Sequence, residues 1–337
     1  MKLVECVPNF SEGRDAKKIQ TIHDAITSVS GVKVLHRDSG FDVNRTVITF
    51  AGDKMSVFQA AFNAIQTAFE LIDMRSHKGV HPRVGATDVC PFIPLSGTSM
   101  RDCISLAREL GKKVGAELDI PVYLYAHAAL IDARRNLSCI RSGEYEGFQT
   151  KLEKAEWKPD FGPARFNPVS GATAIGARPL LIAYNINLDT EELDIAKEIA
   201  AVVRESGKRL VDPDGSVKNI PGRLKQCKAI GWTLKQYNKV QVSMNLVDFT
   251  VTPMHTAFET VKEEAKKRSV HVTGSELIGM CPLEALLQAG RYYLQSDSKP
   301  DQLIQTAVQA LGLNDLGPFD PDAKIIERQI TKLFDEP

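Results

Sequence analysis

The chain has 337 residues, of which 43% are hydrophobic and 25% are charged, and its 42 lysines and arginines balance 42 aspartates and glutamates. This length is enough for one large or two medium hydrophobic cores, and the composition excludes a largely disordered chain. A formal net charge of zero excludes a general electrostatic attraction to nucleic acid or anionic lipid, so an anionic ligand would need a local basic patch.

The first half of the chain alternates short β-rich runs with longer amphipathic helical runs. The predicted strands are 3–7, 32–37, 45–51, 88–94 and 122–125, and the predicted helices are 15–28, 55–72 and 99–117. A loop rich in proline and glycine follows at 157–176. This alternation predicts helices packed on a β-sheet.

A similar order of elements begins again after that loop. The predicted strands are 180–187, 226–234, 239–247 and 276–281, and the predicted helices are 190–205 and 253–267. The short polar turn at 235–238 between two strand-like runs indicates an antiparallel hairpin. We therefore predict two related α+β halves, and a purely parallel sheet is disfavoured.

Two segments of the second half have no strand pattern. The segment 206–223 combines turn residues and basic charge without periodicity, which predicts a mobile loop. The segment 301–334 has helical periodicity and is interrupted at Gly317 and Pro318, which predicts one or two amphipathic helices.

The N-terminus carries one lysine followed by a strand-like run, without the apolar stretch of a secretion signal, and no apolar run reaches the 18 residues of a membrane span. We therefore expect a cytoplasmic protein with no membrane partner. The six cysteines, at 6, 90, 103, 139, 227 and 281, show no CxxC spacing. This spacing predicts buried free thiols and no metal site.

Candidate chemistry is concentrated in the run 76–94, SHKGVHPRVGATDVCPFIP. Histidine exchanges protons near neutral pH, and Pro82 restricts the backbone of His81 to a stiff, extended conformation. A loop histidine in this setting can be a proton shuttle or a structural hydrogen-bonding group. His77 can be a partner of His81 or a residue beside a helix C-terminus.

Three segments together resemble glutamate formiminotransferase: 3–13 (LVECVPNFSEG), the run around His81, and 162–171 (GPARFNPVSG). The resemblance extends from residue 3 to about 326. It implies subdomains at 1–177 and 178–326, each a ferredoxin-like β-sheet with helices on its outer face, a ligand cleft between them, and a tail at 327–337. In animals this domain is fused to a cyclodeaminase, an activity that we do not expect here because only the short tail follows.

The resemblance implies transfer of the formimino group from N-formimino-L-glutamate to tetrahydrofolate, a step of histidine degradation. A tetrahedral adduct of this kind needs a proton shuttle and tight positioning of both reactants. The family's catalytic histidine falls on His81. The resemblance also implies tetrahydrofolate as co-substrate, no metal, folates with polyglutamate tails as further ligands, and a homodimer.

Four more residues are predicted to surround the histidine. Asp38, at the end of a predicted strand, would orient the imidazole or hold the cationic amidine, unless it is an ordinary turn residue. Asn44, Arg45 and Arg83 would converge from separate loops. Arginine suits the carboxylates of glutamate and folate, although surface ion pairs would explain both arginines equally well.

The loop 162–171 resembles the family's folate-binding segment, and its composition fits that role. Glycines allow close approach to a planar ligand, prolines fix the backbone, and Phe166 offers a surface for stacking. Arg165 would meet the ligand's glutamate tail; a plain linker is the alternative. The predicted folate-binding residues are Gly162, Pro163, Ala164, Arg165, Phe166, Asn167, Pro168, Val169, Ser170 and Gly171.

Other features are less specific. The glycine-containing segment 171–178 lacks the nucleotide-binding motifs. Asp88 is predicted to be a cap or a partner of Arg83. A basic patch, either a site for a polyglutamate tail or a solvated face, is predicted from Arg134, Arg135, Arg141, Lys151 and Lys154.

Two other functions fit the same resemblance. An enzyme acting on 5-formyltetrahydrofolate would use a similar pocket, because a formyl group occupies the space of a formimino group. A folate-binding protein without turnover is the second, and the titrating His81 in its His-Pro-Arg context argues against it.

Overall fold

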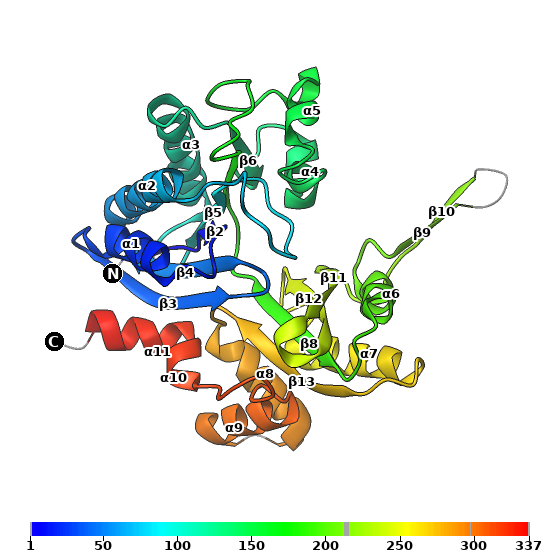
Figure 1. The fold of residues 1–337 in the computed structure, drawn as a ribbon. Coiled ribbons are helices and arrows are strands. Elements are labelled where there is room, and N and C mark those ends of the chain that lie inside the picture. Colours follow the sequence, from blue (N-terminus) through cyan, green and yellow to red (C-terminus); the bar gives the residue numbers. More distant parts are fainter. Residues whose placement is uncertain (1, 212–215, 297, 336–337) are drawn as a thin grey trace. The chain divides into compact units, whose positions relative to one another are not determined.

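The computed structural model describes residues 2–211, 216–296 and 298–335. The chain divides into two compact units, Met1–Pro179 (unit 1) and Leu180–Pro337 (unit 2) (Figure 1). Each unit has a β-sheet packed against helices, which confirms the α+β prediction. Within the described ranges, no helix is long and apolar enough to cross a membrane.

Unit 1 is built on a seven-stranded sheet. Its strands are β1 (Val4–Cys6), β2 (Asn9–Phe10), β3 (Val32–Gly40), β4 (Arg45–Gly52), β5 (Thr87–Pro94), β6 (Val122–Ala126) and β7 (Thr173–Ala177). The order is β1-β4-β2-β5-β7-β6, with β3 paired to β4. β7 is parallel to both β5 and β6, whereas the other pairs are antiparallel.

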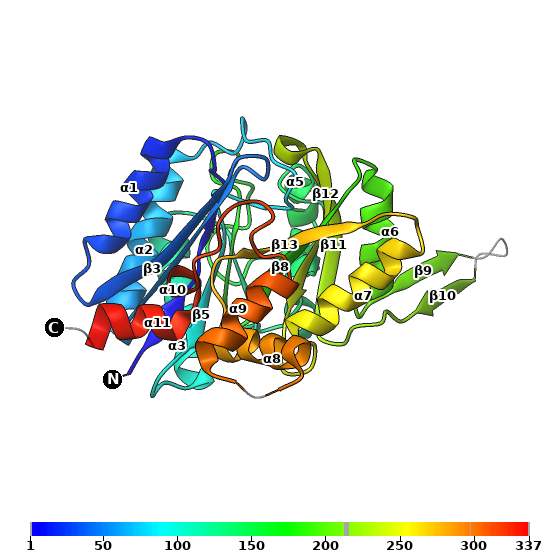
Figure 2. The same cartoon turned by 90° about the horizontal axis from the view of Figure 1, so that it is seen from below.

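Three amphipathic helices pack on one face of this sheet, namely α1 (Ala16–Thr27), α2 (Lys54–Leu71) and α3 (Met100–Glu117) (Figures 1 and 2). Asp15 and Asp53 cap the first two, and each side chain accepts hydrogen bonds from two backbone N–H groups of the first turn. The third begins with a capping box formed by Ser99 and Asp102. These caps explain why the predicted and observed helix starts differ by only one residue.

The chain between β6 and β7 forms short helical elements that we did not predict. They are η1 (Asp132–Arg134), α4 (Leu137–Arg141), α5 (Phe148–Leu152) and η2 (Ala155–Trp157). Arg134 pairs with Asp160 at 2.7 Å, with side chains only 3% and 4% exposed. The ammonium of Lys151 donates to the carbonyls of Cys139, Ile140 and Ser142 at 2.6–3.0 Å. Arg134 and Lys151 are therefore buried structural cations, and the predicted basic patch is wrong for them.

Unit 2 contains a four-stranded antiparallel sheet of order β11-β12-β8-β13. The strands are β8 (Ile182–Leu188), β9 (Lys208–Val211), β10 (Val217–Ile220), β11 (Cys227–Leu234), β12 (Lys239–Leu246) and β13 (Val272–Ile278). The helices are α6 (Leu193–Val203), α7 (Met254–Lys266), α8 (Leu283–Leu294), α9 (Pro300–Ala310), α10 (Pro321–Lys324) and α11 (Ile326–Ile330). One core joins the sheet to α6, α7, α8 and α9.

The predicted hairpin is confirmed as β11 and β12, joined by a short 3-10 turn, η3 (Lys235–Tyr237), and by Asn238 in the left-handed conformation. The predicted mobile loop 206–223 is wrong in part, because β9 and β10 pair there in an antiparallel hairpin that projects from unit 2 (Figures 1 and 2). Its strands of four residues are too short to show a period, and residues 212–215 lie outside the described part. All six cysteines are free thiols.

Candidate active site

His81 lies on the loop between α2 and β5 and is in contact with Arg45, the first residue of β4. Its Nδ1 lies 2.7 Å from the carbonyl oxygen of Pro82, and the Nη1 of Arg45 contacts both ring nitrogens, lying 2.7 Å from Nδ1. If Nδ1 donates to the carbonyl, Nε2 carries the lone pair that accepts from the guanidinium. Arg45 is itself fixed by Asn9 of β2, whose Oδ1 accepts from Nε at 3.0 Å.

The surroundings keep the imidazole neutral. Burial, and then the positive charges of Arg45 and Arg141, hold the pKa of His81 well below its ordinary value. Burial also lowers the pKa of Arg45 to about 9. At neutral pH, His81 is therefore an uncharged base beside a guanidinium.

The depressed pKa of His81 has a consequence for stability. The unfolded histidine, with a pKa of about 6.5, takes up a proton that the folded protein excludes, so we expect the free energy of unfolding to fall as pH drops below about 6.5. Urea unfolding followed between pH 7.5 and 5 measures this slope. His81→Asn should make the slope shallower; an unchanged slope would show that other groups cause it, such as His77, whose pKa burial also lowers.

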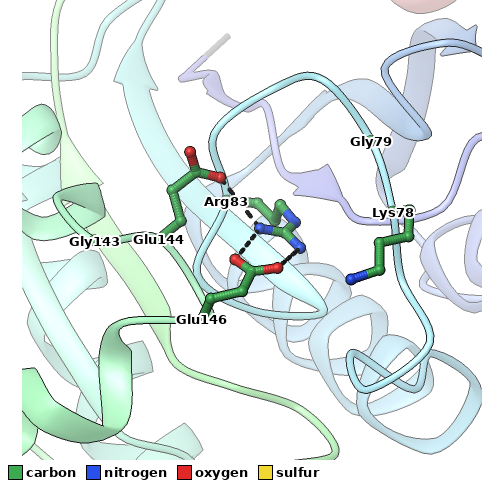
Figure 3. Close-up of a pocket in the computed structure, with 6 residues that line it drawn as sticks. All are labelled: Lys78, Gly79, Arg83, Gly143, Glu144 and Glu146. Atoms are coloured by element: carbon green, nitrogen blue, oxygen red, sulfur yellow. Dashed lines mark hydrogen bonds and ion pairs between the residues drawn. The ribbon is translucent and has the colours of Figure 1, made fainter.

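Among its described hydrogen bonds, Arg83 contacts His77 rather than His81. It also binds two glutamates, Glu144 and Glu146 (Figure 3). Its Nε donates to the Nδ1 of His77 at 3.2 Å, and Nη1 and Nη2 each donate to one oxygen of Glu146 at 2.7 Å. Nη1 also lies 3.1 Å from Glu144. The guanidinium, with a side chain 6% exposed, thus ties the histidine loop to the segment 143–147.

Asn44 joins loops next to the same histidines. Its side-chain Oδ1 accepts from the N–H of Gly13 at 2.9 Å, and its Nδ2 donates to the carbonyl of Lys78 at 3.0 Å. The Nε2 of His77 donates to the Asn44 carbonyl at 2.8 Å. The described hydrogen bonds of Asn44 therefore hold the backbone around His81.

Asp38 and Asp88, the two acidic residues considered near the histidine loop, lie on β3 and β5. Asp38 is half-buried on β3, opposite Val47 of β4. Asp88 accepts from the backbone N–H of Val84 at 3.0 Å and pairs with Arg141. The predicted pairing of Asp88 with Arg83 is therefore wrong.

A cavity of about 510 Å³ lies beside Arg83, and this volume suits a small ligand (Figure 3). Two cationic and two acidic side chains face it, so it carries no strong net charge. Its lining residues are Lys78, Gly79, Arg83, Gly143, Glu144 and Glu146.

The loop 162–171 is held by its own turn and by Tyr145. The Oδ1 of Asn167 accepts from the N–H groups of Val169 and Ser170 at 3.1 Å. The hydroxyl of Tyr145 donates to the Pro168 carbonyl at 2.5 Å, and its ring centroid lies 5.3 Å from that of Phe166. Arg165 pairs with Asp119 at the surface.

Tyr145 is a residue that we did not select from the sequence. Its backbone N–H donates to the carbonyl of Arg83 at 2.9 Å, so it connects the histidine loop with the loop 162–171. A detectable signal was the motif Gly-Glu-Tyr-Glu-Gly at 143–147, an aromatic residue between two acids and two glycines. Tyr145 thus supports both predicted functional loops, the histidine loop and the loop 162–171.

Gly171 has a strict backbone requirement, as does Gly162 at the other end of the loop. The φ of Gly171 is +68°, and a Cβ there would collide with the carbonyl oxygen of Val84. We expect Gly171→Ala to lower the free energy of unfolding by about 2 kcal/mol or more, because strain and backbone collision add. Gly279→Ala is the matched control, since Gly279 has a φ of +70° but open space where a Cβ would lie. If urea unfolding gives equal losses of unfolding free energy for the two variants, the backbone around Gly171 must shift to accommodate the Cβ.

Known proteins with similar sequences cover nearly the whole chain. The model "Formiminotransferase domain, N-terminal subdomain" matches residues 3–178, and "Formiminotransferase domain" matches residues 183–331. A formimidoyltransferase-cyclodeaminase of Rattus norvegicus is 47% identical over 331 residues, or 97% of this chain; the chain spans 59% of that relative.

Shorter relatives match over most of their own length. A glutamate formimidoyltransferase of Streptococcus pyogenes serotype M1 is 42% identical over 87% of this chain and 94% of the relative. One of Thermoplasma acidophilum is 46% identical over 88% of this chain and 93% of the relative.

Proposed function

The chain belongs to the formiminotransferase family, and from that premise we propose that it transfers the formimino group from N-formimino-L-glutamate to tetrahydrofolate. The products are 5-formiminotetrahydrofolate and L-glutamate, as in histidine degradation. The observation that carries the proposal is the 42–46% identity to two glutamate formimidoyltransferases over 93–94% of their length. The reaction as written needs no metal ion or redox cofactor.

His81 is the proton shuttle in this proposal. As N5 of tetrahydrofolate attacks the formimino carbon, the neutral imidazole accepts the proton that leaves N5. The tetrahedral adduct then breaks its bond to the glutamate nitrogen, which receives the proton. Burial and the nearby charge of Arg45 hold the pKa of His81 low, which favours return of that proton. A shuttle of this kind contributes typically about 10²–10⁴-fold in rate.

The other predicted residues either bind substrate or support the loops that do. Arg45 offers its guanidinium to a substrate carboxylate, and by doing so would release the lone pair of His81 that it now occupies. Asp38 faces the cationic amidine, and the loop 162–171 holds the pterin of tetrahydrofolate. Arg83 supports these loops through Glu144 and Glu146, which occupy its donors.

The cellular setting completes the proposal. The protein acts in the cytoplasm as a homodimer, and it accepts folates with polyglutamate tails. Sedimentation of the purified chain at micromolar concentration would test the homodimer, because a monomer and a dimer of a 37.1 kDa chain are well separated.

A direct assay tests the activity. Purified protein is mixed with formiminoglutamate and tetrahydrofolate, acid converts the product to methenyltetrahydrofolate, and its absorbance is read. We expect absorbance that requires both substrates. If 5-formyltetrahydrofolate alone supports turnover, the second candidate function is correct. Tetrahydrofolate binding without any turnover would identify a folate-binding protein.

A further inference from the structure

One face of the unit 2 sheet carries amide side chains. Along β8, Tyr184 and Ile186 belong to the hydrophobic core shared with the helices. The alternate residues Asn185 and Asn187 therefore lie on the opposite face, together with Gln241 of β12. These three amide residues are 2%, 0% and 1% exposed. Burying amide groups costs more desolvation free energy than burying apolar side chains at the same positions would.

Hydrogen bonds connect these amides to a carboxylate. The indole Nε1 of Trp232 donates to the Oε1 of Gln241 at 2.6 Å. The Nε2 of Gln241 donates to the Oδ1 of Asn187 at 2.7 Å and to the Oε2 of Glu276 at 3.0 Å. Asn185 donates to the same Oε2 at 3.2 Å. Buried amides thus hold one oxygen of Glu276.

The far end of the network is also fixed. The Nδ2 of Asn187 donates to the Oδ2 of Asp315 at 2.8 Å. Lys239 and Thr273 donate to the same oxygen at 2.9 Å and 2.6 Å. Asn187 and Gln241 therefore each have partners on both sides, and the network has little freedom to rearrange.

Glu276 differs from the three buried amides of this network, Asn185, Asn187 and Gln241. Its residue is half-buried rather than buried, and among residues 2–211, 216–296 and 298–335 no hydrogen bond reaches its Oε1. A charged acceptor that is accessible on one side and held by buried amides on the other is the arrangement expected of a preorganised binding group.

We propose that Glu276 binds an amidine-type group, in which two N–H donors are attached to one carbon. Carboxylates form strong, charge-assisted hydrogen bonds with such donors. The proposal rests on the proposed function, because both substrates carry this group. Formiminoglutamate has it in the protonated formimino group, and tetrahydrofolate has it in the 2-amino edge of its pterin ring.

The experiment measures binding by calorimetry rather than turnover. Wild type and Glu276→Gln are titrated with formiminoglutamate, and separately with tetrahydrofolate under anaerobic conditions. This substitution keeps the size of the side chain while removing its charge, so we expect a dissociation constant raised about 10- to 100-fold for one ligand. Glu191→Gln, at an exposed glutamate, is the control and should change neither constant.

The ligand whose affinity falls identifies the source of the amidine-type group. Unchanged constants for both ligands, in a variant with a wild-type thermal transition, would overturn the proposal. If Glu276→Gln does not fold, Glu276→Asp keeps the charge but withdraws it by one methylene, and it should weaken the same ligand.

The two proposals fail in different ways. Binding that depends on Glu276, in a protein without transfer activity, would remove the proposed function and keep this site. Transfer activity, together with binding constants that do not depend on Glu276, would keep the proposed function and remove this site. Failure of wild type to bind either ligand would overturn both.

Discussion

His81→Ala should lower formimino transfer at pH 7.5 by at least about 10²-fold, because it removes the group proposed to carry the proton between the two nitrogens. The loss should appear mainly in kcat, since the alanine leaves the loops that bind substrate in place. The measurement is the acid-developed absorbance assay at saturating concentrations of both substrates.

The pH profile and a second histidine make this prediction specific. The low pKa of His81 keeps the base form populated, so kcat/KM for wild type should stay constant from about pH 8 to about 6.5 and decline only in more acidic solution. His23→Ala, on the partly exposed helix α1, should keep wild-type activity. Full activity in His81→Ala would assign His81 a structural role and direct attention to Asp38.

Arg134→Met should lower the free energy of unfolding by about 3–5 kcal/mol, the usual cost of removing one partner of a buried ion pair. The change leaves the Asp160 carboxylate, 4% exposed, without its cation. It also removes donors from the carbonyls of Glu156 and Lys158, at 2.9 Å and 2.6 Å. Urea unfolding followed by circular dichroism gives the difference.

The neighbouring arginine is a matched control. Arg135 pairs with Asp132, but both side chains are exposed, at 61% and 94%, so Arg135→Met should change the free energy of unfolding by less than about 0.5 kcal/mol. Similar values for the two variants would contradict the assignment of Arg134 to the interior. Adding Asp160→Asn to Arg134→Met should recover part of the loss, because the stranded charge is then gone.

Regular amphipathic elements were predictable from the sequence alone. The predicted helix 55–72 is observed as Lys54–Leu71, and the predicted strand 45–51 as Arg45–Gly52. The period of apolar residues and the capping aspartates contain this information locally. Some short elements could not be predicted. Thr173–Ala177, for example, is only five residues of mostly small side chains and has no detectable period.

The candidate site also has a part that was predictable from local sequence and a part that was not. The loop with His81 stands out by composition, and Arg45 was placed near it. The ion pairs of Arg83 with Glu144 and Glu146 join residues 61 and 63 positions apart in the chain. No local pattern encodes contacts over that distance, whereas burial and tertiary packing fix them, and the role of Tyr145 was missed for the same reason.

The position of β7 between β5 and β6 constrains when unit 1 can fold during synthesis on the ribosome. β6 ends at residue 126, yet its partner within the described sheet is β7, which is complete only at residue 177. During synthesis the newly made β6 must therefore wait for about 50 further residues to leave the ribosome, several seconds at ordinary translation rates. Through that interval β5 also exposes an unpaired edge. The sheet is therefore most prone to non-native strand pairing just before the synthesis of unit 1 is complete.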